Sequence, residues 1–493
     1  MIPFEHLVRL DRSSPAPIYR QIAAALVNEI RNGVLGAGTH LPGSRELAKI
    51  LQVHRKTVVA AYEELAAQDW IQVHPRKHVM VSQRIPLLSP QKWKSGLSAT
   101  SYQNDLTLPF RHIAPIGAES SAVPELMIDD GYPDIRLSPI DELLKNYRFY
   151  TSKRHTIKNA NIGTLQGTVQ LRAELARYLS GTRGLAITPD NLLVSHGAQM
   201  SIYLSARLLL EPGSFIVAGK PGYLIANRAF TEAGAKVLEI NVDDQGIDTD
   251  ALEEICRQKK VSAVYVIPHH HYPTTVTLSV ERRMKLLDLS NRYAFTIIED
   301  DYDYDYHYAS SPYLPLASGN HSGNVIYIGS FSKILGPTLR MGFMVAPKNF
   351  IGHCTALRKA IDAGGDGYMQ NALASLIKNS ELSRHLKRAK KVYHHRRDFL
   401  DKLLKEKLYP YGTYTLPTGG MAIWITLRSQ YPVERLLSLP HLQIKGVYPQ
   451  ENAFRFGFAS LDENELETSV SLLKQALETN LPATPPEKPF QPL

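Results

Sequence analysis

The sequence predicts an α/β protein in which a small, helix-rich N-terminal domain precedes a large α/β domain with a small C-terminal subdomain. The 493 residues are too many for one ordinary core. Apolar residues recur every four positions early in the chain, and from residue 129 apolar strands alternate with amphipathic helices. We expect domains at 1–82 and 119–480, joined by a flexible linker at 83–118 and followed by a disordered tail at 481–493.

Composition and charge narrow the class of protein. A hydrophobic fraction of 44% and a charged fraction of 21% are ordinary for a soluble protein. No apolar run approaches the roughly 18 residues of a membrane span and no secretory signal is seen, so we expect a cytoplasmic protein without membrane contact. Cys256 and Cys354 lie far apart in sequence, which argues against disulfides and a cysteine-rich zinc site. The formal charge of +9 permits an acidic partner such as DNA.

The first domain carries the pattern of a helix-turn-helix. Apolar residues spaced four positions apart predict a helix over 17–32. Ser44 is expected to cap a second helix at 45–51. A three-residue turn then leads to a third helix at 55–68. Such a pair presents the first turn of its second helix to the major groove of double-stranded DNA.

Candidate DNA-binding residues follow from this geometry. Arg55, Lys56 and Thr57 occupy the first turn of the predicted recognition helix. Strands at 70–73 and 79–82 would form a wing whose tip carries Arg76 and Lys77, cations that can contact phosphates. The alternative is a small helical bundle whose basic face is merely solvated.

Two stretches resemble the GntR-type winged helix. They are Leu-Pro-Gly-Ser-Arg-Glu-Leu-Ala at 41–48 and the stretch at 53–65, which holds the end of the turn and most of the third helix; the resemblance adds Arg45 to the expected DNA contacts. His54 stands where that family usually has a serine, which predicts a weaker helix cap. Asp69 and the tip at 75–78 replace glycines, which puts the wing geometry in question more than DNA binding.

Turn-forming residues and hydrophobic periodicity distinguish the linker from the α/β region. Proline and serine interrupt 83–118 and no hydrophobic period is present, whereas 481–493 is rich in proline. Helical patterns fill the gaps between strands, and the basic run at 384–397 is interpreted as a solvated helix face. The predicted strands of the large domain and of the subdomain lie at 191–195, 215–218, 263–267, 296–299, 325–328, 420–427 and 453–458.

The most informative stretch is 325–345. An apolar strand is followed by Ser330, Ser332 and Lys333, and then Arg340 precedes a second strand. A dry pocket that lowers the pKa of Lys333 would favour the neutral amine, which forms a Schiff base with an aldehyde. The two hydroxyls and the guanidinium could hold a phosphate, so the set describes a pyridoxal 5'-phosphate site. The alternative is a solvated loop lysine between two strands.

Other parts of such a site occur upstream. Backbone N–H groups of Gly197, Ala198 and Gln199 open a helix after a strand and could cradle the phosphate. Asp300 ends another strand, where it could pair with a protonated pyridine nitrogen, and Tyr302 could donate to the ring oxygen. An acidic, tyrosine-rich surface loop is the alternative for this last segment.

The lysine block looks like that of fold-type I aminotransferases. The resemblance implies that Lys333 is the catalytic lysine, that the ring of Tyr223 stacks on the cofactor and that Arg455 clamps a substrate carboxylate. A core tyrosine and a surface arginine are the plainer alternatives. The consecutive histidines 269–271 point to alternate sides of an extended chain and cannot chelate one ion together, so no metal site is predicted. Thr275, nearby, replaces a usual glycine.

A GntR-type winged helix, a linker and an aminotransferase-like domain form the layout of the MocR family of bacterial transcription regulators, which the whole chain resembles. The resemblance implies a homodimer that is domain-swapped head to tail. It also implies that pyridoxal phosphate or a small amino-compound effector is sensed through aldimine exchange at Lys333. Ile225 stands where the GABA-responsive member has an arginine, so a GABA effector is not supported. A catalytically active aminotransferase with an accessory DNA-binding domain is the alternative.

Overall fold

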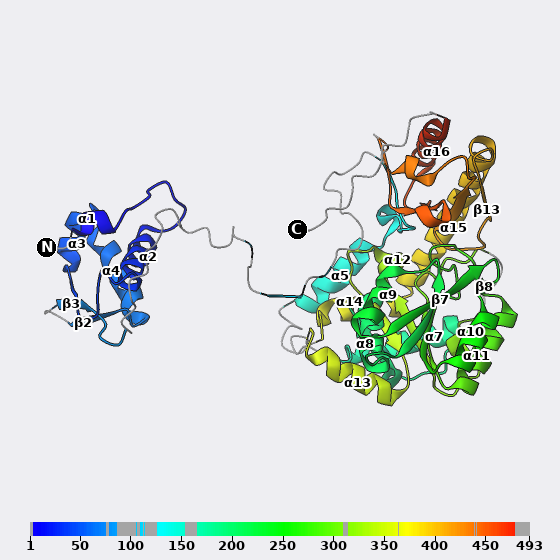
Figure 1. The fold of residues 1–493 in the computed structure, drawn as a ribbon, viewed down its shortest axis with the longest axis horizontal. Coiled ribbons are helices and arrows are strands. Elements are labelled where there is room, and N and C mark those ends of the chain that lie inside the picture. The colour runs from blue at the N-terminus through cyan, green and yellow to red at the C-terminus, as the bar shows by residue number, and fades with distance from the viewer. Residues whose placement is uncertain are drawn as a thin grey trace. The chain divides into compact units, whose positions relative to one another are not determined.

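The computed structural model divides into two compact units, Met1–Ala114 and Pro115–Leu493, and each is described by itself (Figure 1). The predicted linker is described at 83–85 and at a few later positions, and the predicted tail lies outside the described residues. The structure describes residues 3–74, 78–85, 105, 109–111, 113, 126–152, 165–308, 314–362, 364–437, 439 and 441–478.

The first unit is a helix-turn-helix with an antiparallel sheet. Its core contains the fully buried Ile22, Leu26, Leu47 and Val58, so the predicted stripe of four-residue spacing does face the interior. The sheet has the order β1-β3-β2, which confirms the winged-helix prediction. The elements are α1 (Phe4–Leu7), α2 (Ile18–Arg31), β1 (His40–Leu41), α3 (Ser44–Ile50), α4 (Arg55–Ala67), β2 (Ile71–His74) and β3 (His78–Val81).

Local details of this unit differ from the predicted ones. Helix α3 begins at Ser44, so Gly43 is its N-cap and Ser44 is already helical. His54 caps α4 in place of the usual serine, with Nδ1 accepting from the Lys56 N–H at 3.2 Å. Asp69 has φ of +59°, a left-handed conformation that glycine adopts more easily. The wing tip with Arg76 and Lys77 lies outside the described residues.

The second unit is built on an eight-stranded sheet of order β5-β12-β11-β10-β9-β6-β7-β8. Strands β11, β10, β9, β6 and β7 are parallel neighbours, whereas β12 runs antiparallel to both β11 and β5. The bounds are β5 (Leu192–Ser195), β6 (Phe215–Lys220), β7 (Lys236–Asp243), β8 (Gly246–Ile247), β9 (Val261–Val266), β10 (Thr296–Asp300), β11 (Val325–Ser330) and β12 (Gly342–Val345).

Helices cover both faces of this sheet, which is why its strands read as continuous apolar runs. Successive strand residues enter different cores: Leu193 packs with α8 and α13, whereas Val194 packs with α7 and α14. The predicted α/β domain is therefore confirmed. The helices are α5 (Ile140–Thr151), α7 (Val169–Arg183), α8 (Ala198–Leu209), α9 (Leu224–Glu232), α10 (Thr249–Gln258), α11 (Val280–Tyr293), α12 (Ser332–Leu335), α13 (Lys348–Lys359) and α14 (Gly367–Lys378).

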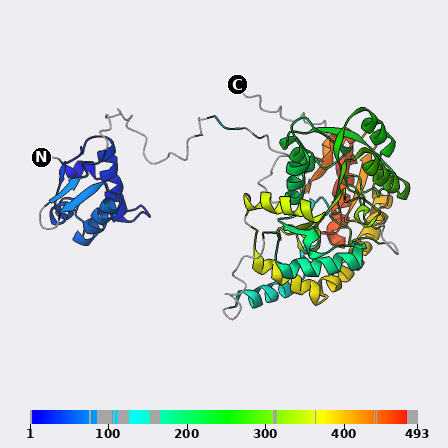
Figure 2. The same ribbon diagram turned by 90° about the horizontal axis from the view of Figure 1, so that it is seen from below.

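The small subdomain packs two helices on an antiparallel sheet of order β13-β14-β17-β16. Its orange elements lie together at the upper end of the unit in Figure 1 and are seen from below in Figure 2. Among the described residues, no helix has the length and apolar character needed to cross a membrane. The elements are α15 (Glu381–Lys407), β13 (Gly412–Tyr414), β14 (Ala422–Leu427), β16 (Gly446–Tyr448), β17 (Ala453–Gly457) and α16 (Glu463–Glu478).

Two long-range contacts join this subdomain to the segment that precedes α5. Strand β4 (Leu126–Ile128) pairs in parallel with β15 (Leu442–Ile444). Arg396 of α15 is buried and lies 2.9 Å from Asp134 Oδ2. The basic run of α15 is thus mostly a solvated face, as predicted, but Arg396 and the buried His385 serve packing instead. Residues 129–134 are held against the subdomain by these contacts.

Candidate functional site

The carboxyl ends of the parallel strands bring the predicted site residues together. Ser195, Asp300 and Ser330 end β5, β10 and β11, and antiparallel β12 begins at the same edge of the sheet. A cavity of about 190 Å³ opens there. Its lining comprises Asp130, Tyr132, Ala198, Gln199, Tyr223, Ile267, Tyr272, Asp300, Tyr302, Ser330, Ser332, Lys333, Pro337 and Arg340.

One corner of the cavity is suited to an anion. Gly197 has φ of +82°, and a Cβ on it would lie 2.8 Å from Arg340 Nη2, so a larger residue there would strain the backbone and displace the guanidinium. Arg340 Nη1 lies 3.4 Å from Ser332 Oγ, and the Ser332 N–H donates to Ser330 Oγ at 3.1 Å. Helix α8 begins at Ala198 and directs its first N–H groups toward this corner. Hydroxyl, guanidinium and backbone donors together match a phosphate.

Lys333 lies in the short helix α12 at the cavity wall. Its Nζ donates to the carbonyl oxygen of Gly131 at 2.7 Å and lies 4.3 Å from the ring centroid of Tyr132. Burial lowers the pKa of Lys333, although the nearby Asp130 carboxylate opposes the shift. The environment therefore favours the neutral, nucleophilic amine.

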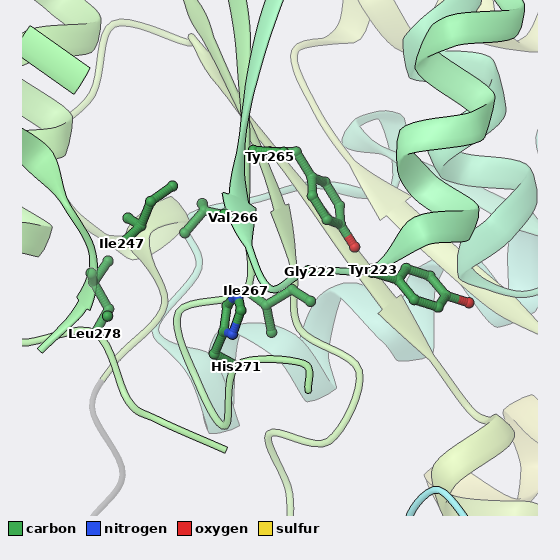
Figure 3. A pocket seen from close by; sticks show the side chains of 11 residues that line it. Gly222, Tyr223, Ile247, Tyr265, Val266, Ile267, His271 and Leu278 are labelled. Carbon is green, nitrogen blue, oxygen red and sulfur yellow. The ribbon is translucent and has the colours of Figure 1, made fainter. Parts of the chain in front are cut away.

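Asp300 presents one free carboxylate oxygen to the cavity. Tyr265 donates to Oδ2 at 2.7 Å, while Oδ1 is buried and has no hydrogen bond within the part of the chain that the structure describes. Burial raises the pKa of Asp300 to about 7. Figure 3 shows Tyr265 and Val266 on opposite sides of β9, with Tyr223 on the side of Tyr265. A ring N–H donor fits the free oxygen.

The aromatic side of the cavity is formed by hydrogen-bonded tyrosines. The Tyr223 hydroxyl accepts a hydrogen bond from Gln199 Nε2, and the ring of Tyr223 meets that of Tyr272 edge to face with 5.2 Å between the ring centroids. The Tyr302 hydroxyl donates to the His270 carbonyl oxygen at 2.9 Å and accepts from Arg455 Nη2 at 3.0 Å. The hydroxyl of Tyr302, expected to reach a ring oxygen, is thus already bonded to the protein.

Arg455, the predicted carboxylate clamp, is not among the residues that line the cavity. Its side chain is 1% exposed, and its Nε lies 3.3 Å from Asp130 Oδ1. Asp130, Tyr132, Ile267, Tyr272 and Pro337 are lining residues that the sequence did not predict. The sequence held a signal for the first two, because they lie within the Asp-Asp-Gly-Tyr-Pro-Asp stretch at 129–134 that opens the α/β region.

The predicted DNA-binding side chains that are described lie on one motif. Arg45, Arg55 and Lys56 are exposed and Thr57 is half-buried. Arg55 Nε lies 3.4 Å from Ser44 Oγ, so the start of α4 contacts the start of α3. The arrangement leaves the cations at the start of the recognition helix open to a groove.

Among the described residues, no group of His, Cys, Asp or Glu is arranged to hold a metal ion. The histidines that suggested one are paired with carboxylates that follow β10. His269 Nδ1 lies 3.2 Å from Asp301, and His270 Nδ1 lies 2.9 Å from Asp303. Thr275 closes this loop with φ of +64°, the conformation for which a glycine is usual.

Comparison with known families assigns both units. Residues 144–473 match the family model "Aminotransferase class I and II". The chain belongs to the aminotransferase class I and II family. Residues 18–81 match a second model, "Bacterial regulatory proteins, gntR family". The order of the two regions confirms the predicted MocR layout.

Relatives of this aminotransferase-family chain include regulators of matching length. An uncharacterized HTH-type transcriptional regulator YisV of Bacillus subtilis is 28% identical over 95% of this chain and 97% of its own. The probable rhizopine catabolism regulatory protein MocR of Rhizobium meliloti is 27% identical over 95% of both chains. The solved multiple substrate aminotransferase of Thermococcus profundus, 28% identical with a TM-score of 0.67, covers 73% of this chain and 92% of its own.

Proposed function

We propose that the protein is a pyridoxal phosphate-dependent, DNA-binding transcriptional regulator whose aminotransferase-like domain senses the cofactor or an amino compound. The observation that carries this proposal is the presence, in one chain, of a gntR-family region and an aminotransferase region that together align end to end with HTH-type regulators. The cavity at the strand ends supplies the sensor, and the first unit supplies the DNA-binding element.

The residues that would hold pyridoxal phosphate are those gathered at the cavity. Ser330, Ser332, Arg340 and the backbone of 197–199 would receive the phosphate, and Asp300 Oδ1 would receive the ring nitrogen. Tyr223 would lie against the ring, and Tyr302 keeps this face of the cavity hydrogen-bonded. When bound, the cofactor supplies an aldehyde carbon that takes up primary amines. Lys333 would yield its place on this carbon to the effector's amine, an exchange that leaves its Nζ as the free amine and needs no redox partner.

For DNA, the roles follow from position on the winged helix. Arg55, Lys56 and Thr57 at the start of α4 reach base edges or nearby phosphates, and Arg45 at the start of α3 contacts the backbone. The wing-tip cations Arg76 and Lys77 add phosphate contacts only. Since its target is the bacterial chromosome, such a regulator acts in the cytoplasm.

We further propose a homodimer, domain-swapped head to tail. Exposed apolar side chains on α5 and α8 offer a surface for a second copy: Ile140, Leu144, Phe149, Tyr203 and Leu208. With a tether at 83–118, the domain at 1–82 could then reach across to the partner's 119–480 domain. Light scattering of the full-length protein tests the dimer, and a monomer at micromolar concentration would contradict it.

A true aminotransferase with an accessory DNA-binding domain is the second candidate, favoured by the extent of the solved aminotransferase neighbours. DNA binding distinguishes the two. The full-length protein should bind a duplex from upstream of its own gene at least tenfold more tightly than a scrambled duplex, within the usual range of specificity ratios. Equal affinity for both duplexes, together with sustained transamination, would favour the enzyme.

A further inference from the structure

Asp130 is placed between the buried arginine Arg455 and the cavity. The carboxylate lines the cavity and its side chain is 21% exposed, whereas the Arg455 side chain is 1% exposed and does not line it. Asp130 Oδ1 lies 3.3 Å from Arg455 Nε and forms an ion pair with it. This buried oxygen accepts no hydrogen bond within the described part of the chain, because the Arg455 Nε–H donates to the Asp130 carbonyl oxygen at 3.4 Å. The guanidinium thus already has a carboxylate partner, and that partner belongs to the protein.

Both terminal nitrogens of Arg455 also donate hydrogen bonds to the protein. Nη1 donates to the Pro273 carbonyl oxygen at 2.8 Å, Nη2 donates to the Tyr302 hydroxyl at 3.0 Å, and the Tyr272 ring lies 5.1 Å from the guanidinium carbon. An incoming carboxylate would have to displace Asp130 and leave that acid without its partner. Breaking a buried ion pair in this way is strongly unfavourable.

The charged side chains that line the cavity also disfavour a carboxylate on the effector. Four charged side chains line it: Asp130, Asp300, Lys333 and Arg340. The proposed cofactor engages the last three, which leaves one carboxylate to face an effector. The rings of Tyr132 and Tyr272 stand beside it, and aromatic faces attract cations.

We propose that the effector is a primary amine that carries a second cationic group, such as an α,ω-diamine, and that amines carrying a carboxylate are disfavoured. One amino group reacts at the position of Lys333, and the second donates to the Asp130 carboxylate against the tyrosine rings. This inference rests on the proposed function and specifies its effector class.

Three amines of equal chain length test the ligand class. The cofactor-loaded, full-length protein is titrated with 1,4-diaminobutane, 1-butylamine and 4-aminobutanoate, and the visible absorbance and the melting temperature are followed. We expect half-saturation by the diamine at a concentration about tenfold or more below that of butylamine, since a hydrogen bond between charged groups is worth that much. We expect 4-aminobutanoate to be the weakest of the three.

A variant without the charge of Asp130 tests whether this residue causes the preference for the diamine. Asp130→Asn should cut the preference for the diamine over butylamine by about tenfold and improve 4-aminobutanoate, because Arg455 loses its internal carboxylate. Asp244→Asn, at an exposed position away from the cavity, is the matched control and should keep the parent ranking. If Asp130→Asn does not fold, the ranking by the parent protein is itself decisive.

The outcomes separate the two claims. A spectral response in which 4-aminobutanoate matches or exceeds the diamine overturns the effector class and leaves the proposed sensor intact. No response of the parent to any of the three amines, with cofactor bound, overturns both.

Discussion

Lys333 Nζ donates to the carbonyl oxygen of Gly131 at 2.7 Å, although 202 positions separate the two residues. This contact joins the lysine block to the segment that β4 holds against the small subdomain. Burial lowers the pKa of Lys333 and so shifts its amine toward the neutral, nucleophilic form. The relationship places the amine of a short helix at the cavity, where we propose that it is the reactive group.

The first prediction concerns the identity of that lysine. The purified protein should absorb visible light with cofactor bound, and borohydride treatment followed by peptide mass mapping should place the label on Lys333. Lys333→Ala should lose the visible band. Lys348→Ala, at an exposed position on α13, is the control and should retain it. A label on another lysine would remove Lys333 from the proposed role.

The second prediction concerns the phosphate corner. Arg340→Ala should weaken cofactor binding by about tenfold to a hundredfold, because a charge-assisted partner of the phosphate is lost. Arg207→Ala, exposed on α8, serves as the control. Equilibrium dialysis of the cofactor measures both. Unchanged affinity in Arg340→Ala would show that another group holds the phosphate.

The third prediction uses the raised pKa of Asp300, about 7 against an ordinary value of 3.8. Because the pKa of Asp300 is higher in the folded protein than in the unfolded chain, the protonated carboxyl stabilises the fold. This contribution is fully present below about pH 4 and is lost as the pH rises through 7. Without cofactor, the free energy of unfolding of Asp300→Asn should therefore rise relative to that of the parent between pH 5 and pH 7.5. The gain is at most about 1.4 kcal/mol per pH unit.

Urea denaturation of cofactor-free parent and Asp300→Asn at the two pH values measures this difference. Glu299, whose pKa burial raises to about 8, is present in both proteins and cancels in the comparison. A difference between variant and parent that does not change with pH would mean that Asp300 is ionised in the fold throughout this range.

The fourth prediction separates the two kinds of DNA contact. Arg55→Ala and Lys56→Ala should erode the preference for operator over scrambled duplex, since these residues begin the recognition helix. Arg76→Ala and Lys77→Ala should weaken binding to both duplexes alike and flatten the salt dependence by about one unit of slope per lost phosphate contact. Gel-shift titrations at two salt concentrations distinguish the patterns. If Arg55→Ala and Lys56→Ala weaken binding to both duplexes equally, these side chains contact the DNA backbone and not the base edges.

Local patterns predicted much of the fold and the site. The Ser-Lys block and Asp300 were recognisable because each lies at or just after the end of a strand, and parallel strands bring their carboxyl ends to one edge. Tyr223 was assigned by resemblance to the aminotransferases. Helix caps were less predictable: α3 begins one residue early because the extended Gly43 serves as its N-cap.

The remaining site residues depend on contacts that sequence spacing does not carry. Asp130 reaches Arg455 across 325 positions, and it does so because β4 pairs with β15 beside the small subdomain. The sequence predicted Tyr265 only as a residue of a strand. Because side chains alternate between the two faces of β9, its hydroxyl lies on the side of Asp300 and donates to it. Partners of this kind become visible only once the strands are placed.

The response of operator binding to an effector tests the regulator most directly. The probe is an amine that shifts the visible spectrum of the parent protein, and operator affinity of the full-length protein is measured with and without it. The amine should change the affinity of the parent and leave that of Lys333→Ala unchanged, while Lys333→Ala still binds the operator. A normal response by Lys333→Ala, or no preference of the parent for operator over scrambled DNA, would contradict the proposed function.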